Sequence, residues 1–326
     1  MEAIGIYIHI PFCNSKCSYC DFSSFVADED LKKAYVEALI LEISSKKDLR
    51  PVESIYMGGG TPSCLEISQL KRIFRAVFDN YNVLENCEVS MEANPGTISE
   101  ALICEIKNAG VNRLSMGAQA SDKRLLEMLR RQHSFFDVIE GVHTAKNCGI
   151  DNINIDLMLG LPMQDSSILS ETIKEALKLP LKHISCYGLI VEEGTRLEKR
   201  ISSGELSLPE VEEERKMYKA AQKILNENGY MQYEISNFAK EGYESRHNVN
   251  CWKQHEYYGF GIGSSSYYNN VRYMNIRVIY RYIEKYLKGK NKKFVIRREG
   301  KESELNRENI NKNINKLSTI LYIIKI

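Results

Sequence analysis

Short runs of β-branched and aromatic residues alternate with longer amphipathic stretches along the first 190 residues of the chain. In residues 29–46, apolar side chains recur at intervals of three and four, the spacing of one buried helix face. The same spacing predicts helices in residues 66–79, 98–108, 121–147 (as two helices) and 166–178. The runs between them are predicted to be strands: Ile4–Ile10, Ser54–Met57, Glu88–Glu92, Arg113–Met116, Ile153–Leu157 and Ile184–Leu189. Such alternation predicts a parallel sheet with right-handed crossovers.

Glycine-rich or polar motifs follow nearly every predicted strand. They are the cysteine-rich loop after residue 10, Gly58-Gly59-Gly60-Thr61-Pro62, Glu92-Ala93-Asn94-Pro95, Gly117-Ala118-Gln119, Gly160-Leu161-Pro162 and Val191-Glu192-Glu193. In barrels of parallel strands, functional groups collect at the carboxyl ends of the strands. One site formed by all these strand ends is a simpler explanation than several unrelated loops. We therefore expect an α/β fold with a partial (β/α)6 TIM-like barrel, rather than an open doubly wound sheet.

The pattern changes after residue 200. A long amphipathic helix is predicted first, and the aromatic, polar segments after it are expected to be strands and loops packed beside the barrel. We therefore divide the chain into a barrel core (1–200), an accessory α+β region (201–284) and a basic tail (285–326). The tail holds 12 Lys or Arg against 4 Asp or Glu, and its composition is typical of a truncated or disordered segment.

The composition is that of a globular protein, with 43% apolar and 27% charged residues. A formal net charge of +1 gives no overall field that would favour nucleic acid. No apolar run reaches the roughly 18–20 residues of a membrane-spanning helix, and the first residues lack the features of a signal peptide. We therefore expect a cytoplasmic protein with no transmembrane segment and no nucleic-acid partner.

The nine cysteines do not suggest a disulfide framework, because their number is odd and six of them are isolated in the sequence. Isolated cysteines in a globular protein mostly serve as small packing residues. Cys87, Cys104, Cys148 and Cys186 are therefore expected to be buried and unpaired.

Cys13, Cys17 and Cys20 are spaced by four and then three residues and directly follow the first predicted strand. Thiolates are the usual ligands of iron–sulfur clusters, and a four-iron cluster normally takes four of them. Three thiolates leave one iron open, and an open position generally marks a reactive metal site. The spacing therefore favours a cluster that binds a substrate or cofactor on its fourth iron. A zinc clip, or three unrelated cysteines, is the alternative.

Several other motifs carry groups suited to a small polar ligand. The glycines at 58–60 would let the backbone approach such a ligand, although a tight turn explains them equally well. Glu92, Gln119 and Asp156 lie in or at the ends of apolar strands, where a buried carboxylate needs a partner such as an ammonium or ribose hydroxyls. Arg131 has the geometry to pair with a carboxylate through two hydrogen bonds. Structural salt bridges are the alternative for the charged residues.

The spacing Cys13-x3-Cys17-x2-Cys20, with Tyr19 before the third cysteine, is the signature of radical S-adenosyl-L-methionine (SAM) enzymes. With the other motifs, the sequence resembles the oxygen-independent coproporphyrinogen III oxidase-like group over roughly five-sixths of the chain. The further motifs that carry this resemblance are Tyr7–Cys13, Gly58–Pro62, Glu92–Pro95, Arg113–Gln119, Asp156–Pro162, Tyr233–Phe238 and His247-Asn248. One such motif is weak evidence, whereas all of them in the same order are specific.

The resemblance implies a partial barrel of the radical SAM type that carries a 4Fe-4S cluster on Cys13, Cys17 and Cys20. SAM would bind the open iron through its amino and carboxylate groups, and the reduced cluster would cleave it to a 5′-deoxyadenosyl radical. The positions that match SAM contacts in the family are Tyr7, Gly59 and Glu92 for one SAM, and Tyr19, Gly60, Thr61, Gln119, Arg131 and Asp156 for further contacts. The hard chemistry would belong to the cofactors, and the protein would bind and orient them.

Phe22 distinguishes between two branches of this group. The decarboxylating oxidases carry a fourth cysteine two residues after the third, whereas this sequence has Phe22 there. It therefore resembles the HemW-type branch, which is similar to haem chaperones that bind haem and deliver it to respiratory haem proteins. The expected partners are haem, haem-accepting respiratory proteins and an electron donor. Oxidase-type decarboxylation of a porphyrinogen is the alternative, and a non-catalytic metal clip is a further one.

His247 is the candidate haem ligand, because neutral imidazole binds iron well and His247-Asn248 matches a family motif. Cys251 stands where the family has tyrosine in that motif. A lone histidine is more often a structural residue, so that interpretation stays open. His9, just before the cysteine loop, is expected to pack and orient its neighbours.

Overall fold

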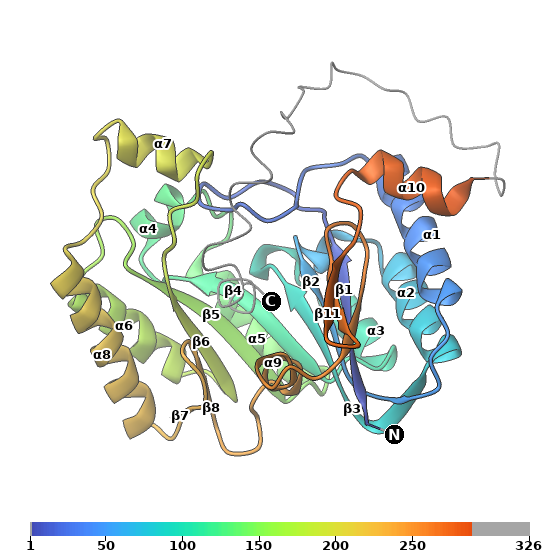
Figure 1. Cartoon of the computed structure of the whole chain (residues 1–326). Helices are drawn as coiled ribbons and strands as arrows, with labels where there is room; N and C mark the ends of the chain where they lie inside the picture. The colour runs from blue at the N-terminus through green and yellow to red at the C-terminus, as the bar shows by residue number, and fades with distance from the viewer. Residues whose placement is uncertain (1, 289–326) are drawn as a thin grey trace.

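Six parallel strands in chain order form the centre of the fold (Figure 1). The structure, a computed structural model, describes residues 2–288, so the predicted basic tail lies outside the described residues from position 289 onward. The strands are β1 (Ile4–Ile10), β2 (Pro51–Gly59), β3 (Asn82–Ala93), β4 (Arg113–Gln119), β5 (Asn152–Leu159) and β6 (His183–Gly188). Each pairs in parallel with the next, and every strand predicted before residue 190 is confirmed.

Helices follow the strands, as the alternation predicts. They are α1 (Glu29–Ser45), α2 (Ile67–Asn80), α3 (Glu100–Asn108), α4 (Lys123–Met128), α5 (Phe135–Asn147) and α6 (Ser166–Leu177), with short 3-10 turns at η1 (Pro62–Cys64) and η2 (Pro95–Thr97). The side chains of Asp28, Ser99, Ser134 and Asp165 each accept a backbone N–H at a helix start, which fixes where these helices begin. Within residues 2–288, each helix is too short or too polar to span a membrane.

Side chains alternate between the two faces of the core strands. On β5, Ile153, Ile155 and Leu157 join the hydrophobic core, whereas Asn154 and Asp156 line the interior of the curved sheet. The neighbouring strands follow the same rule, and their inward polar residues include Tyr56, Glu92, Arg113, Ser115 and Ser185. The interior of this barrel is therefore a polar surface that a ligand can contact.

The region after residue 200 extends the same sheet at both ends. β8 (Asn237–Ala239) pairs antiparallel with β6 and with β7 (Met231–Gln232), while β9 (Tyr257–Phe260) pairs in parallel with β1. β10 (Ser265–Tyr268) and β11 (Val271–Met274) complete the order β11-β10-β9-β1-β2-β3-β4-β5-β6-β8-β7. Because β7 and β11 lie at opposite ends of this order, the barrel is open, and the predicted partial barrel is confirmed.

The remaining helices are α7 (Arg196–Ser202), α8 (Val211–Glu227), α9 (Arg246–Trp252) and α10 (Ile279–Leu287). α7 crosses the boundary predicted at residue 200 and α10 crosses the one predicted at residue 284, and the division into three parts stays a prediction. The expectation of strands and loops is wrong for residues 246–252, which form α9. Ser245 accepts the N–H of Asn248 and begins this helix, whose seven residues are too few to show an apolar period in the sequence.

Glu42, a buried carboxylate on α1, fastens the accessory region to the barrel. Its two oxygens accept hydrogen bonds from the N–H of Gly261 (2.8 Å), Nδ2 of Asn275 (2.8 Å) and the hydroxyls of Tyr282 (2.7 Å) and Tyr286 (2.9 Å). These donors replace the water that a carboxylate would bind at the surface, since Glu42 is only 2% exposed. The contacts join α1 to α10 and to the chain between β9 and α10.

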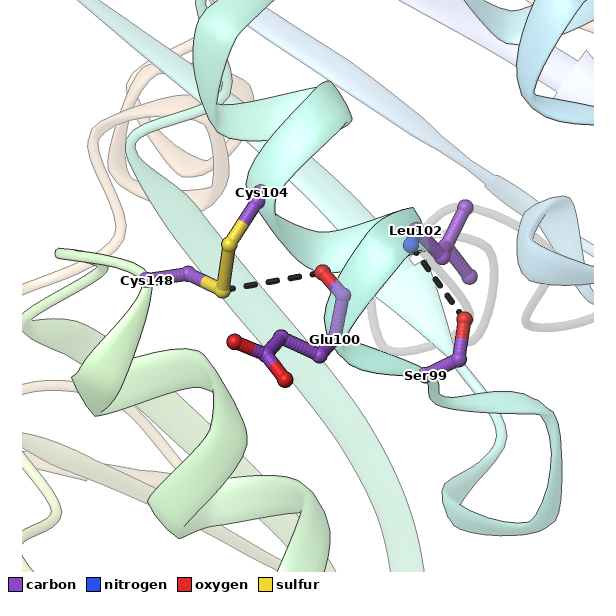
Figure 2. Close-up of a disulfide and its surroundings, with 5 residues drawn as sticks. All are labelled: Ser99, Glu100, Leu102, Cys104 and Cys148. Atoms are coloured by element: carbon purple, nitrogen blue, oxygen red, sulfur yellow. Dashed lines mark hydrogen bonds between the residues drawn. A yellow bond between two sulfur atoms is a disulfide. The ribbon is translucent and has the colours of Figure 1, made fainter.

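Cys104 and Cys148 form a disulfide between two neighbouring helices, with their Cα atoms 5.0 Å apart (Figure 2). Cys104 lies on α3, and Cys148 directly follows α5. The expectation that these two cysteines are unpaired is wrong, because 44 residues separate them in the sequence and only the packing of the helices brings them together. Cys87 and Cys186 are buried and unpaired, as predicted.

Candidate functional site

A cavity of about 240 Å³ lies at the carboxyl ends of the core strands. It is lined by the loop after β1 and by the ends of β2 to β6. The predicted site residues in its wall are Cys13, Cys17, Tyr19, Cys20, Gly59, Gly60, Thr61, Glu92, Gln119, Arg131 and Asp156. Two predicted residues lie elsewhere: Tyr7 borders a second cavity of about 200 Å³, and His247 lies in the wall of neither.

The loop that carries the cysteines is folded back on itself. The N–H of Phe25 donates to O of Pro11 at 2.9 Å, and the N–H of Cys13 donates to O of Phe25 at 3.1 Å. Lys16 Nζ donates to two carbonyl oxygens later in the loop, those of Phe22 and Ser24, both at 3.0 Å. These contacts hold the loop in a shape in which all three cysteines line the cavity.

Each of the three sulfur atoms has a polar neighbour. Thr61 Oγ1 lies 3.5 Å from Cys13 Sγ, Arg131 Nη1 lies 3.4 Å from Cys17 Sγ, and Ser24 Oγ lies 3.8 Å from Cys20 Sγ. Hydrogen bonds to the sulfur ligands are among the factors that set the reduction potential of an iron–sulfur cluster. The protein therefore provides a polar surrounding for a cluster at this position.

The donor set fits a 4Fe-4S cluster. Burial raises the pKa of the Cys13 and Cys20 thiols above the ordinary value, so metal binding must displace their protons. Among the described residues, no three His, Cys, Asp or Glu side chains converge on one point as the ligands of a single metal ion do. A four-iron cluster does not need that convergence, because each thiolate binds a different iron. Cys13, Cys17 and Cys20 all line the same cavity, as the ligands of one such cluster must.

Gly59 and Gly60 expose bare backbone to the cavity because the space behind them is filled. A Cβ on Gly60 would lie 2.6 Å from O of Phe12, and one on Gly59 would lie 2.4 Å from the ring of His9. Gly59 also has a φ of 111°, which glycine adopts at little cost. The glycine run therefore fits both explanations given for it. It packs tightly against β1, as a tight turn would, and it leaves the backbone exposed to the cavity, where a ligand could approach it. His9 packs against this junction, as predicted.

Glu92 and Asp156 face the cavity from β3 and β5. The hydroxyl of Tyr56 (2.8 Å) and the N–H of Gly59 (3.0 Å) donate to Glu92, and Asn154 Nδ2 (2.7 Å) donates to Asp156. Burial and then the Asp156 charge raise the pKa of Glu92 to about 7, and burial raises the pKa of Asp156. Neither carboxylate has a salt-bridge partner within residues 2–288. A ligand that brings an ammonium or hydroxyl group would stabilise both charges.

Arg131 connects the cysteine loop with β4. Besides its contact with the Cys17 sulfur, its Nη2 donates to O of Gly117 at 2.6 Å. Among the described residues Arg131 has no salt bridge to a carboxylate, so the structural alternative is absent there, and pairing with the carboxylate of a ligand stays a prediction. Gln119 has a φ of 67° and accepts the hydroxyl of Tyr187 at 2.8 Å. Left-handed backbone is uncommon for a residue other than glycine and gathers at binding sites.

Further cavity residues were not predicted from the sequence, although they lie on the same strands. They are chiefly Tyr56, Arg113, Ser115, Asn154, Ser185 and Tyr187. Most stand at alternate positions of one strand, as Arg113 and Ser115, Asn154 and Asp156, and Ser185 and Tyr187 do, because every second side chain of a strand points inward. That period of two is the signal that would have found them. Arg113 is only 2% exposed, and its Nη1 lies 3.5 Å from Ser90 Oγ.

His247 lies one layer below the cavity, among the rings of Tyr7, Tyr56 and Tyr257. The ring centroids are 6.4, 5.4 and 6.2 Å from that of the imidazole, respectively. Nδ1 lies 3.1 Å from Ser54 Oγ, and Nε2 has no hydrogen-bond partner in the described part of the chain. Burial lowers the pKa of His247 to about 3, which keeps the imidazole neutral. It has the chemistry of an iron ligand but is fully enclosed, so this role stays a prediction.

Comparison with known proteins identifies relatives that cover most of the chain. Residues 7–176 match the Radical SAM superfamily. The chain is 38% identical over 278 residues to the protein named heme chaperone HemW of Lactococcus lactis, which covers 85% of this chain and 73% of that protein. It is also 38% identical over 282 residues to heme chaperone HemW of Bacillus subtilis, covering 85% of this chain and 74% of that one.

A solved structure shares the fold. Coproporphyrinogen III oxidase (HemN) from Escherichia coli, described as a radical SAM enzyme, superposes with a TM-score of 0.75 over 86% of this chain and 69% of its own. At 22% identity this likeness shows the fold alone. The superfamily match begins in β1 and contains the cysteine loop, both buried carboxylates and the glycine run. The chain therefore belongs to the radical SAM superfamily, and within it to the HemW-type branch.

Proposed function

We propose that this chain is a haem chaperone that holds a 4Fe-4S cluster and SAM and delivers haem to respiratory haem proteins. The observation that carries the proposal is a single cavity lined by three cysteines and by polar strand ends, in a chain 38% identical to two proteins named as haem chaperones. Phe22 favours a carrier over an oxidase, because it places an apolar ring at the cavity where the oxidase branch has a fourth cysteine.

In this proposal, Cys13, Cys17 and Cys20 would hold the cluster in the cavity that the strand ends also line. When bound, the cluster and SAM supply electron transfer and radical chemistry, with the electron coming from a separate donor. The chain binds and orients SAM. The residues proposed to contact it are Tyr7, Tyr19, Gly59, Gly60, Thr61, Glu92, Gln119, Arg131 and Asp156.

The two carboxylates and the glycine run have different proposed tasks. Glu92 and Asp156 accept the positive or hydroxyl groups of SAM, because they are buried and have no salt-bridge partner in residues 2–288. The bare backbone of Gly59 and Gly60 lets the ligand approach the sheet edge. Arg131 faces Cys17 and keeps a positive charge beside the cluster.

Haem is the proposed cargo, and His247 is its candidate ligand. With α9 in place, the tyrosine rings enclose His247, so haem reaches Nε2 only after α9 moves. The N–H groups of Arg246 (2.8 Å) and His247 (3.2 Å) at the start of α9 donate to the carboxylate of Glu88. These contacts must break before α9 moves, and local opening of one seven-residue helix costs less free energy than unfolding of the whole protein. Haem binding through His247 therefore requires an open state of α9.

The proposal is tested by anaerobic reconstitution with iron and sulfide, followed by titration with haem. We expect haem binding, transfer of haem to an apo-haem protein, and no decarboxylation of coproporphyrinogen. Formation of decarboxylated product would favour the oxidase alternative, and tight zinc without a cluster would favour the metal clip. His247→Ala is expected to lose haem, whereas the control His255→Ala, a partly exposed histidine three residues beyond α9, is expected to retain it.

A further inference from the structure

A chain of buried and partly buried hydrogen bonds runs from the cavity to the start of α9. Asn154 Nδ2 lies 2.7 Å from Asp156 Oδ1, and His183 Nδ1 lies 2.6 Å from Asn154 Oδ1. The hydroxyl of Tyr233 lies 2.7 Å from His183 Nε2 and accepts the N–H of Ser245 at 3.2 Å. Asn154 is 1% exposed, and His183 and Ser245 are fully buried. Water therefore does not compete for the bond between His183 and Asn154, whereas the other three bonds are partly buried.

The donors and acceptors allow one arrangement of the protons. A carboxylate only accepts hydrogen bonds, so Asn154 must turn its NH₂ group toward Asp156 and its oxygen toward His183. His183 then carries its proton on Nδ1, and its Nε2 accepts the hydroxyl proton of Tyr233. The hydroxyl oxygen in turn accepts the N–H of Ser245. Burial lowers the pKa of His183 well below its usual value, which keeps the imidazole neutral, as this arrangement requires.

The far end of the chain fixes α9. Ser245 caps this helix, since its Oγ accepts the N–H of Asn248 at 3.5 Å. The Ser245 hydroxyl also lies 3.4 Å from a carboxylate oxygen of Glu88, the residue that accepts the first N–H groups of α9. α9 carries His247, and Asn248 lines the cavity. The hydrogen-bond chain thus ends at the helix that carries the candidate haem ligand.

We propose that His183 and Tyr233 are positioning residues, which hold Asn154 in the orientation that supports Asp156 and which tie α9 to the same chain. The inference rests on the proposed function where it assigns Asp156 to SAM, whereas the hydrogen-bond chain itself does not depend on it. Movement of α9 withdraws the N–H of Ser245 from Tyr233, and His183 and Asn154 are then held less firmly. Opening of α9 and binding at Asp156 therefore influence each other, in both directions.

A second buried tyrosine provides a matched control. Tyr230 is 2% exposed, and its hydroxyl donates to O of Leu181 at 2.9 Å. This bond is not part of the hydrogen-bond chain between Asp156 and Ser245. Tyr230→Phe removes one buried hydroxyl from the same part of the fold and leaves the chain intact. Tyr233→Phe removes a link of the chain and leaves His183 Nε2 and the Ser245 N–H without that partner.

The test compares Tyr233→Phe, Tyr230→Phe and the unaltered full chain after anaerobic reconstitution. The dissociation constant of SAM is measured by calorimetry, hydrogen exchange of the α9 amides by mass spectrometry, and the His183 tautomer by nitrogen NMR, assigned with His183→Gln. Tyr233→Phe is expected to weaken SAM binding about threefold to tenfold and to speed exchange in α9. Tyr230→Phe is expected to change neither by more than about twofold.

Two results would overturn the inference. One is equal SAM affinity and equal α9 exchange in the two tyrosine variants. The other is a proton on Nε2 of His183 in the unaltered protein, because the chain requires it on Nδ1. If the unaltered protein binds no SAM, the proposed function fails, but the tautomer and the exchange rates still decide whether the hydrogen-bond chain positions α9.

Discussion

Glu92→Gln is predicted to stabilise the cofactor-free protein and to weaken SAM binding. Burial and then the Asp156 charge raise the pKa of Glu92 from 4.5 to about 7. The folded state therefore favours the protonated carboxyl more than the unfolded chain does. The contribution that the protonated Glu92 carboxyl makes to the free energy of unfolding is fully present below pH 4.5 and is lost as the pH rises through about 7. At about 1.4 kcal/mol for each tenfold change in ionisation, the upper limit of this loss is about 3 kcal/mol at pH 8.

Glutamine removes the charge but keeps an oxygen for the Gly59 N–H and an NH₂ group for the Tyr56 oxygen. We expect the variant to match the unaltered protein in stability near pH 4.5 and to exceed it by about 1–3 kcal/mol at pH 8. The assay is urea unfolding of the cofactor-free protein at both pH values. In reconstituted protein at pH 8, the same change is expected to weaken SAM binding by about tenfold or more, because a charged acceptor is lost.

The control is Glu85→Gln, which alters an exposed carboxylate on the same strand and is expected to leave both quantities unchanged. Two results would contradict this prediction: lower stability of Glu92→Gln than of the unaltered protein at pH 8, or unchanged SAM affinity. The first result would mean that Glu92 is structurally satisfied by Tyr56 and Gly59. The second would mean that SAM does not contact it.

Three further predictions concern single contacts. Glu42→Ala removes the acceptor of four hydrogen-bond donors and is predicted to lower the free energy of unfolding by about 3 kcal/mol. The control Glu37→Ala breaks a largely exposed ion pair on the same helix and is predicted to lower it by about 1 kcal/mol or less. Similar losses for the two variants in urea unfolding would contradict the role of Glu42. Replacing Cys104 and Cys148 by serine is predicted to lower the free energy of unfolding by up to about 4 kcal/mol under oxidising conditions, because the disulfide closes a loop with a 44-residue separation and so restricts the unfolded chain. In the presence of a thiol reductant, the same replacement is predicted to leave the free energy of unfolding unchanged. Cys17→Ser is predicted to prevent assembly of a full cluster, measured as iron and sulfide per chain; an unchanged content would remove Cys17 from the ligand set.

The core of the fold follows from local patterns, because apolar period and turn chemistry act over short distances. Alternation on β5 places Ile155 in the core and Asp156 in the cavity, and both positions are visible in the sequence. The cysteine spacing and the motifs after each strand likewise indicate a shared site, since parallel strands bring their carboxyl ends to one edge. These features needed no knowledge of long-range contacts.

The features that were missed depend on contacts between distant segments. The disulfide between Cys104 and Cys148 exists because α3 and α5 are neighbours on the barrel. His247 is enclosed by Ser54 and by tyrosine rings that lie on strands far from it in the sequence. The sequence around residue 247 therefore does not predict the enclosure. Asn154 and His183 looked like ordinary strand residues until the register of β5 and β6 placed them side by side.

The three thiols and the strand ends are proposed to form one site in which SAM binds the cluster. The most direct measurement is electron paramagnetic resonance of the reduced, reconstituted protein with SAM that carries an isotope label in its carboxylate or amino group. We predict hyperfine coupling between the label and the cluster, and a much weaker coupled signal in Glu92→Gln at equal SAM concentration. A cluster whose spectrum does not change when saturating SAM is added would contradict this proposal.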